Sequence, residues 1–171
     1  MDHLKSKIRN VPDFPKPGIL FYDITTLLQD PAGFHEAVDS LALPYVGKGI
    51  DVVVGIESRG FIFGSAVADR LGAGFAPVRK PGKLPSTTVR VSYDLEYGSD
   101  ALEIHSDAVK PGQRVLIVDD RLATGGTAKA ASDLVSQIGG KVHALAFLIE
   151  LVALKGRDRL VGQTLHTVLT Y

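Results

Sequence analysis

The chain contains no cysteine and no tryptophan, and it has a single methionine. Without cysteine, neither a disulfide framework nor a thiolate zinc site can form. The five histidines are scattered, and none forms a pair at the helical spacing of metal ligands. We therefore interpret them as ordinary surface or core side chains and expect no metal ion held directly by the protein.

An excess of charge is also absent, because nineteen Lys and Arg residues balance nineteen Asp and Glu residues. A net charge of zero gives no general attraction to nucleic acid or to an anionic membrane, so any anion site must be local. No apolar run approaches the roughly twenty residues that span a bilayer. Residues 1–7 also lack the apolar core of a signal peptide. We expect a cytoplasmic protein that binds neither nucleic acid nor membranes.

What the chain does have is the composition of one ordinary globular domain. Its 171 residues are 45% hydrophobic and 22% charged, which suffices for a real core. We find no repeat, low-complexity tract or linker, so we predict a single domain over residues 1–171.

Predicted strands and helices alternate along most of this domain. Asp30 and Pro31 are typical of a helix start, and that helix is expected to run toward Pro44. Helical periodicity follows residues 60 and 127. This alternation predicts an α/β fold with a central parallel sheet flanked by helices, whose ligands bind at the carboxyl ends of the strands. The expected strands are 51–56, 75–78, 114–118 and 142–148.

Two segments depart from the alternation. Residues 1–30 are irregular and proline-rich but carry several apolar side chains, which predicts an ordered cover rather than a disordered tail. Residues 79–107 form an insertion whose middle alternates between apolar and polar side chains, with a turn at 98–100. We interpret the insertion as a long hairpin that acts as a lid, and a packing or dimerisation arm is the alternative.

The strongest functional signal is the segment from Val115 to Thr127. Four apolar residues predict a buried strand, and Asp119 and Asp120 are expected where that strand ends. The loop 123–127, Ala-Thr-Gly-Gly-Thr, then opens into an amphipathic helix, whose amino terminus and glycine-rich backbone suit a phosphate group. The two acids are placed to accept hydrogen bonds from sugar hydroxyls. The segment predicts a ribose 5-phosphate site, and an ordinary capped strand-to-helix turn is the alternative.

This segment resembles the phosphoribosyl pyrophosphate (PRPP) motif of type I phosphoribosyltransferases. Further segments make nearly the whole chain similar to the adenine phosphoribosyltransferase family: Asp13–Gly18, Phe21–Ile24, Glu57–Phe61, Arg79–Pro85, Ser92–Gly98 and Leu154–Arg157.

The resemblance implies a type I phosphoribosyltransferase fold, with residues 1–30 as a base-binding hood and residues 79–107 as a flexible hairpin lid. It implies transfer of ribose 5-phosphate from PRPP to N9 of adenine, which yields AMP and pyrophosphate in purine salvage. It also implies a homodimer that uses Mg²⁺.

The same resemblance assigns roles to individual residues. Asp119 and Asp120 hold the ribose hydroxyls, while Mg²⁺ is bound through PRPP and water. Glu96 is the lid acid that assists protonation at N7 of the purine, with Tyr97 beside it. The peptide bond between Glu57 and Ser58 is expected to be cis. The implied phosphate-binding residues are Ala123, Thr124, Gly125, Gly126 and Thr127. The implied pyrophosphate-binding residues are Ser58, Arg59, Arg79, Lys80 and Lys83, of which Arg79 and its neighbours reach the PRPP of the partner subunit.

Chemistry alone favours the same placement of charges. Breaking the bond between C1 and pyrophosphate leaves positive charge on the ribose and negative charge on the leaving group. Cations are therefore expected at pyrophosphate and carboxylates near the sugar. Arg59 has the planar fork that suits pyrophosphate oxygens, so it joins Glu96, Asp119 and Asp120 among the candidate catalytic residues.

The base pocket departs from the family pattern. Leu20, Phe21 and Tyr22 of the hood are expected to hold adenine, with Arg121 on the opposite face of the base. Tyr22 stands where the family usually has Arg, and Arg121 stands where it usually has Leu. The guanidinium of Arg121 can stack on a purine, although a cationic wall could instead favour a 6-oxopurine. A non-catalytic PRPP sensor on the same fold is a further alternative.

Overall fold

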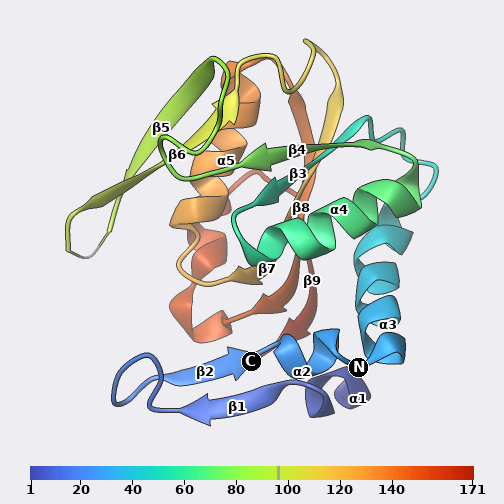
Figure 1. Cartoon of the computed structure of the whole chain (residues 1–171), viewed down its shortest axis with the longest axis vertical. Coiled ribbons are helices and arrows are strands. Elements are labelled where there is room, and N and C mark those ends of the chain that lie inside the picture. The colour runs from blue at the N-terminus through green and yellow to red at the C-terminus, as the bar shows by residue number, and fades with distance from the viewer. Residues whose placement is uncertain (96) are drawn as a thin grey trace.

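A computed structural model describes residues 1–95 and 97–171, so Glu96 lies outside the described residues. Its centre is a five-stranded sheet with the order β4-β3-β7-β8-β9, in which all neighbouring strands are parallel (Figure 1). The predicted parallel sheet is therefore confirmed. The strands are β3 (Val52–Ile56), β4 (Gly74–Val78), β7 (Arg114–Leu122), β8 (Lys141–Glu150) and β9 (Leu165–Thr170).

Strand β7 is longer than the sequence predicted. Its pairing with β3 ends at Val118, but its pairing with β8 continues to Leu122. Asp119 and Asp120 therefore lie within the strand, at the point where one neighbour has stopped and the sheet edge opens. The expectation that the strand ends before the two acids was wrong, because an apolar run records burial on both faces and not the extent of backbone pairing.

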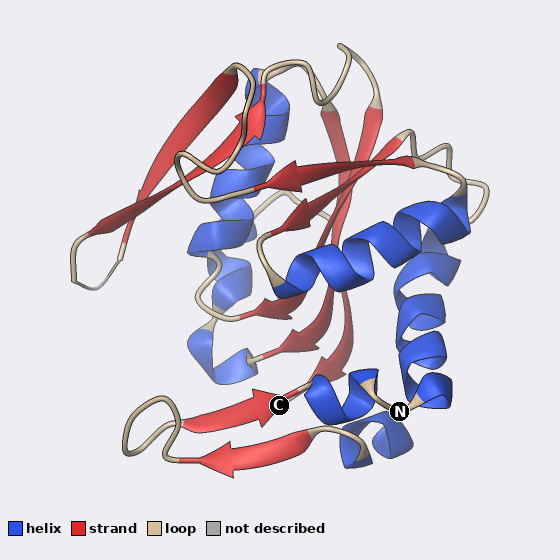
Figure 2. Cartoon of the chain, viewed as in Figure 1, coloured by secondary structure: helices blue, strands red, loops and turns tan. Residues whose placement is uncertain are grey.

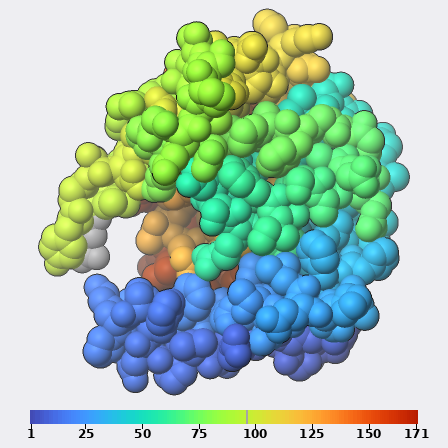
Figure 3. Space-filling model, in the orientation of Figure 1, coloured from blue at the N-terminus to red at the C-terminus, as the bar shows by residue number. Residues whose placement is uncertain are grey.

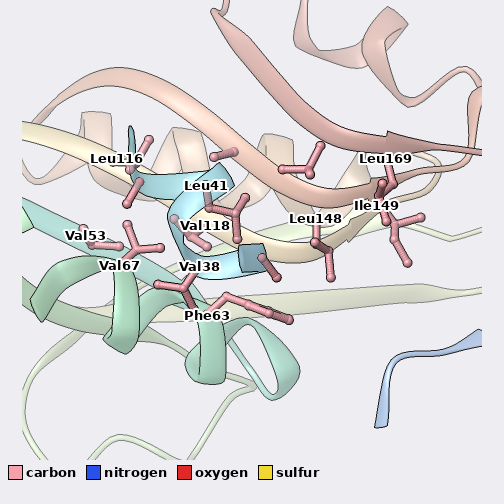
Figure 4. Close-up of a cluster of buried hydrophobic side chains, with 14 of the residues drawn as sticks. Val38, Leu41, Val53, Phe63, Val67, Leu116, Val118, Leu148, Ile149 and Leu169 are labelled. Atoms are coloured by element: carbon pink, nitrogen blue, oxygen red, sulfur yellow. The ribbon is translucent and has the colours of Figure 1, made fainter. Parts of the chain in front are cut away.

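Helices cover both faces of the sheet, as predicted. One face is covered by α3 (Pro31–Ala42) and α4 (Arg59–Leu71), and the other by α5 (Gly126–Gln137) (Figure 2). Side chains of β7 alternate between the two resulting cores. Leu116 belongs to the first core, which also contains Phe63 (Figure 4). Ile117 belongs to the second core. Complete burial of a Leu or Phe side chain contributes about 1.5–3 kcal/mol, so these two cores fix the position of the sheet edge.

The start of α3 is as the sequence predicted. The Asp30 carboxylate accepts a hydrogen bond from the backbone N–H of Gly33 at 3.2 Å, and Pro31 occupies the first turn. Both features stabilise a helix amino terminus, because they satisfy or remove a backbone donor that lacks a partner.

The insertion forms the predicted hairpin. Strand β5 (Thr88–Asp94) pairs with β6 (Ser99–His105) in antiparallel register, and the apolar face of β5 packs against the second core. The hairpin crosses α5 and extends away from the body of the molecule (Figure 1). That it acts as a flexible lid stays a prediction.

The first thirty residues are more regular than expected. They contain α1 (Asp2–Ser6) and α2 (Thr25–Leu28), and a hairpin of β1 (Arg9–Pro12) and β2 (Leu20–Asp23). The expectation of irregular structure was wrong, because each strand has only four residues, too few to show an alternating pattern, and prolines lie in the connection between them. The buried side chains of α1 and α2 join the first core, so the segment is an ordered cover as predicted.

Three short 3₁₀ helices complete the described elements: η1 (Leu43–Tyr45), η2 (Val152–Leu154) and η3 (Gly156–Leu160). Strand β9 also escaped the sequence analysis, because it is a short edge strand with only two buried residues, Val168 and Leu169. Across residues 1–95 and 97–171, no helix has the length and apolarity needed to cross a membrane.

Candidate active site

A cavity of about 300 Å³ lies at the carboxyl ends of β3 and β7. Its lining comes from residues 57–59 around the start of α4 and from residues 119–122 at the end of β7. Residues 123–125 of the following loop and residues 127–128 in the first turn of α5 complete it. In the space-filling view an opening separates the hairpin from the N-terminal segment, and residues of the loop before α5 are visible behind it (Figure 3). The predicted acids and the predicted phosphate loop therefore share one cavity.

The loop 123–127 has the shape of an anion cradle. Gly125 has a φ angle of 89° and forms the amino-terminal cap of α5, so the free amide groups of that helix face the loop. A Cβ on Gly125 would lie 2.4 Å from the carbonyl oxygen of Gly156, and a Cβ on Gly156 would lie 2.4 Å from that of Ala123. Two glycines thus allow the segment 154–157 to support the back of the loop.

Thr124 and Thr127 contribute hydroxyl groups to this cavity. Both residues also border a second cavity of about 370 Å³, which lies under the hairpin and includes Gly126, Tyr93 and Arg159. Gly126 is the one predicted phosphate-loop residue from 124–127 that does not line the first cavity.

The two acids differ in their partners. The Asp120 carboxylate is buried, and its Oδ2 lies 2.8 Å from Nε of Arg59. The Asp119 carboxylate accepts a hydrogen bond from the backbone N–H of Asp120 at 2.8 Å. Burial, reinforced by the neighbouring Asp120 carboxylate, raises the pKa of Asp119 well above its usual value. Gly60 permits this arrangement, because a Cβ there would lie 2.7 Å from Oδ1 of Asp119.

The peptide bond between Glu57 and Ser58 is cis, as the resemblance implied. The Glu57 carboxylate accepts hydrogen bonds from Nε of Arg79 at 2.9 Å and from the backbone N–H of Lys80 at 3.3 Å. Burial opposes ionisation of Glu57, but the hydrogen bonds from Arg79 and Lys80 outweigh it and lower the pKa. Ser58 and Arg59 line the cavity beside this bond.

The basic segment of residues 79–83 lies outside this cavity. Arg79 is held by Glu57, and the ammonium group of Lys80 pairs with the Asp100 carboxylate on β6. Lys83 is likewise not among the residues that line the cavity. Within one subunit, the described structure thus brings together Ser58 and Arg59 of the predicted pyrophosphate set but not the three residues of the basic segment.

The hood brings Phe21 to the cavity. The Phe21 ring centroid lies 5.4 Å from Cζ of Arg59 and 5.7 Å from Cζ of Arg121, and Phe14 packs edge-on against the ring at 5.2 Å. Arg121 itself lines the cavity. Leu20 is exposed on the same hairpin.

Tyr22 does not accompany Phe21. Its ring stacks on Tyr171 with centroids 4.0 Å apart and packs against the first core. Neighbouring side chains on a strand point to opposite faces, so Phe21 and Tyr22 cannot both face the cavity. This differs from the expectation that the Tyr22 side chain lines the base pocket.

At the far end of the hairpin, Tyr97 is 89% exposed and is not among the residues that line the cavity. Glu96, the predicted lid acid, is the residue outside the described part of the chain. The sequence patterns did not single out two residues near the site. Gly156 belongs to the family motif of residues 154–157 without a role of its own, and Tyr93 has the pattern of an apolar position in an alternating strand.

Comparisons with known proteins agree with this geometry. Residues 25–165 match the sequence profile of the phosphoribosyl transferase domain. An adenine phosphoribosyltransferase from Acidobacterium capsulatum is 64% identical over 98% of this chain and 93% of its own length. The chain belongs to the adenine phosphoribosyltransferase family. It is therefore a pentosyltransferase of the type I phosphoribosyltransferase fold and acts in purine salvage.

Solved structures of family members have the same architecture over their whole length. The enzyme from Thermoanaerobacter pseudethanolicus superposes with a TM-score of 0.96 at 50% identity and covers 99% of both chains. The Saccharomyces cerevisiae enzyme, solved in complex with an imino-altritol bisphosphate and adenine, superposes with a TM-score of 0.93 at 42% identity. That alignment covers 98% of this chain and 97% of the yeast chain.

Proposed function

We propose that this chain transfers the ribose 5-phosphate group of PRPP to N9 of adenine, forming AMP and releasing pyrophosphate. The supporting observation is that Arg59 joins Phe21 of the hood to Asp120: its Cζ lies 5.4 Å from the Phe21 ring centroid and its Nε lies 2.8 Å from Oδ2 of Asp120. Arg59 and Asp120 line one cavity with most of the loop 123–127. A cation for an anionic leaving group and carboxylates for sugar hydroxyls therefore line one cavity, and a flat apolar ring for a base lies next to that cation. This combination of groups suits the proposed reaction.

The reaction exchanges one bond at C1 of the ribose for another. The bond from C1 to the pyrophosphate oxygen breaks, and its electron pair leaves with pyrophosphate. The lone pair of N9 then forms the new bond to C1, and the proton that adenine carries at N7 passes to the Glu96 carboxylate, the group proposed to transfer that proton. Asp119 and Asp120 hold the sugar hydroxyls and face the positive charge that develops on the ribose, while Arg59 faces the negative charge on pyrophosphate.

Mg²⁺ fits this site as a partner of the substrate. Among the described residues, no three carboxylate, imidazole or thiolate groups converge as a metal site would require. Of the carboxylates that line the cavity, Glu57 is paired with Arg79, while Asp119 and Asp120 lie side by side. Mg²⁺ prefers oxygen ligands and retains water, which suits binding through PRPP with these carboxylates nearby. When bound, the ion neutralises charge on the pyrophosphate oxygens.

The position of the basic segment supports a homodimer. Arg79, Lys80 and Lys83 do not line the cavity of their own subunit, which suits a role at the PRPP of a partner once Arg79 and Lys80 exchange their pairing with Glu57 and Asp100 for that anion.

Glu96 and Tyr97 act in this proposal from the tip of the hairpin. Glu96→Gln should reduce kcat more than it weakens PRPP binding, because the acid assists bond formation at the purine and not the binding of the sugar phosphate. Equal losses in both quantities would assign the hairpin tip a structural role instead.

The relatives and Phe21 favour adenine as the base. Arg121 departs from the family pattern in the base pocket, so the base specificity should be tested. Nucleoside monophosphate formation should be measured with PRPP and Mg²⁺, as AMP from adenine and, in parallel, as IMP from hypoxanthine and GMP from guanine. We expect turnover with adenine alone. Turnover with an oxopurine would mean that Arg121 has changed the specificity of the pocket. Binding of PRPP without reaction of any base would favour a sensor.

A further inference from the structure

Tyr93 connects the hairpin to the phosphate loop. Its ring lies against the first residue of α5, since a Cβ on Gly126 would meet Cδ2 of Tyr93 at 3.4 Å. Its hydroxyl oxygen lies 3.4 Å from Oγ1 of Thr127 and 3.4 Å from Oδ2 of Asp100. One side chain thus bridges β5, β6 and the first turn of α5.

The chemistry of the three groups determines which atom donates in each contact. The ammonium group of Lys80 pairs with Asp100 and, with a backbone hydrogen bond from Ala101, lowers the pKa of that carboxyl group. An ionised carboxylate can only accept hydrogen bonds. The single hydroxyl proton of Tyr93 is therefore donated to Asp100. The contact with Thr127 then requires the hydroxyl proton of Thr127, which Tyr93 accepts.

A second group can accept the hydroxyl proton of Thr127. Thr127 lines the cavity that holds the substrate in our proposed function, and a phosphate oxygen bound at the loop 123–127 is an anionic acceptor, stronger than a phenol oxygen. One proton cannot serve both acceptors. Substrate phosphate and Tyr93 therefore compete for the same hydroxyl group.

We propose that Tyr93 is a positioning residue that ties the hairpin to Thr127 in the free enzyme and loses this tie when the 5′-phosphate of the substrate takes the Thr127 proton. This inference rests on the proposed function. It links occupancy of the phosphate loop to the freedom of the hairpin that carries residues 95–98. The coupling passes through one hydrogen bond, so its size is limited to the net strength of such a bond.

Tyr93→Phe isolates this effect, because the ring that packs on Gly126 is retained and only the hydroxyl is lost. Binding of ribose 5-phosphate should become about 2- to 10-fold tighter, the range that corresponds to one net hydrogen bond. Ser92→Ala is the matched control, since it removes an exposed hydroxyl from the neighbouring residue on the opposite face of β5. The control variant should bind as the wild type does.

Hydrogen exchange supplies a readout that simple packing would not move. In the wild type, ribose 5-phosphate should accelerate exchange of the β5 and β6 amides, whereas in Tyr93→Phe exchange should already be fast and unaffected by the ligand. Unchanged or weaker binding of ribose 5-phosphate by Tyr93→Phe would overturn the role of Tyr93 but not the proposed function. The same holds if ribose 5-phosphate does not change hydrogen exchange in the wild-type hairpin. A wild-type chain that fails to bind ribose 5-phosphate would overturn the proposed function as well.

Discussion

The guanidinium group of Arg59 and the carboxylate of Asp120 form a 2.8 Å ion pair where the start of α4 meets β7. Asp120 is buried, and Arg59 also lies over the ring of Phe21. The pair thus connects the sugar end of the cavity with the hood. Arg59 thus compensates the negative charge of the buried Asp120 carboxylate, which would be costly without a partner.

Replacing Asp120 by Asn should lower kcat/KM by about 100-fold or more, the scale on which loss of one electrostatic contact in an active site acts. The side chain keeps its shape but loses the charge that pairs with Arg59 and faces the ribose. Steady-state kinetics with PRPP and adenine measure the loss, and thermal unfolding checks the fold. Asp133→Asn, on the exposed face of α5, is the control and should retain activity. Near-normal kcat/KM for Asp120→Asn would refute the assigned role.

Gly125→Ala should disrupt the phosphate loop. The new Cβ would lie 2.4 Å from the carbonyl oxygen of Gly156, so the loop must move, and KM for PRPP should rise at least about 10-fold. Gly162→Ala separates this clash from backbone strain. Gly162 has a similar φ of 85°, but nothing lies within 4 Å of its Cβ position. It should lose about 1 kcal/mol of stability and keep its activity. Equal effects of the two substitutions would rule out the clash.

Arg121→Leu tests the cationic wall of the base pocket. The Cζ atom of Arg121 lies 5.7 Å from the Phe21 ring centroid, and in the proposed complex this guanidinium stacks on adenine instead. A cation–π contact contributes about 0.5–1 kcal/mol, so its loss should raise KM for adenine about 2- to 5-fold while KM for PRPP stays constant. Measuring both constants in one set of assays provides the internal control. A change confined to PRPP would place Arg121 at the sugar phosphate rather than at the base.

Asp23 should contribute stability that depends on pH. Hydrogen bonds from the Thr25 side chain, the Thr25 backbone and Arg9 lower the pKa of Asp23 from 3.8 to about 2. Because the folded value is depressed, the contribution is present above pH 4 and is lost as the pH falls from about 4 to 2. Solvent screening reduces it to about 1 kcal/mol.

Denaturant unfolding of Asp23→Asn and wild type checks this prediction. The two proteins should differ at pH 7, and the difference should shrink toward pH 2. Asp69→Asn removes an exposed carboxylate on α4 and should show no such trend. A difference that persists at pH 2 would mean that Asp23 acts through packing and not through its charge.

Local sequence patterns predicted much of this structure. The apolar run 115–118 predicted the central strand, Asp30 and Pro31 predicted a helix start, and alternation over 89–97 predicted the hairpin. Each signal works because burial, capping and side-chain alternation act between residues close together in the chain. The glycine-rich loop with its two acids predicted a ribose phosphate site for the same reason.

Contacts between distant segments were decided only by the tertiary structure. Tyr22 stacks on Tyr171 and is thereby turned away from the cavity, and this contact depends on the position of Tyr171 next to β2. The support of Gly125 by Gly156 and the contact of Tyr93 with Thr127 likewise join segments that share no local pattern. The sequence by itself determined the central strands, the start of α3, the hairpin of residues 79–107 and the chemistry of the glycine-rich loop, because these follow from neighbouring residues. Packing determined which side chains face the cavity, because only the assembled layers bring those residues together.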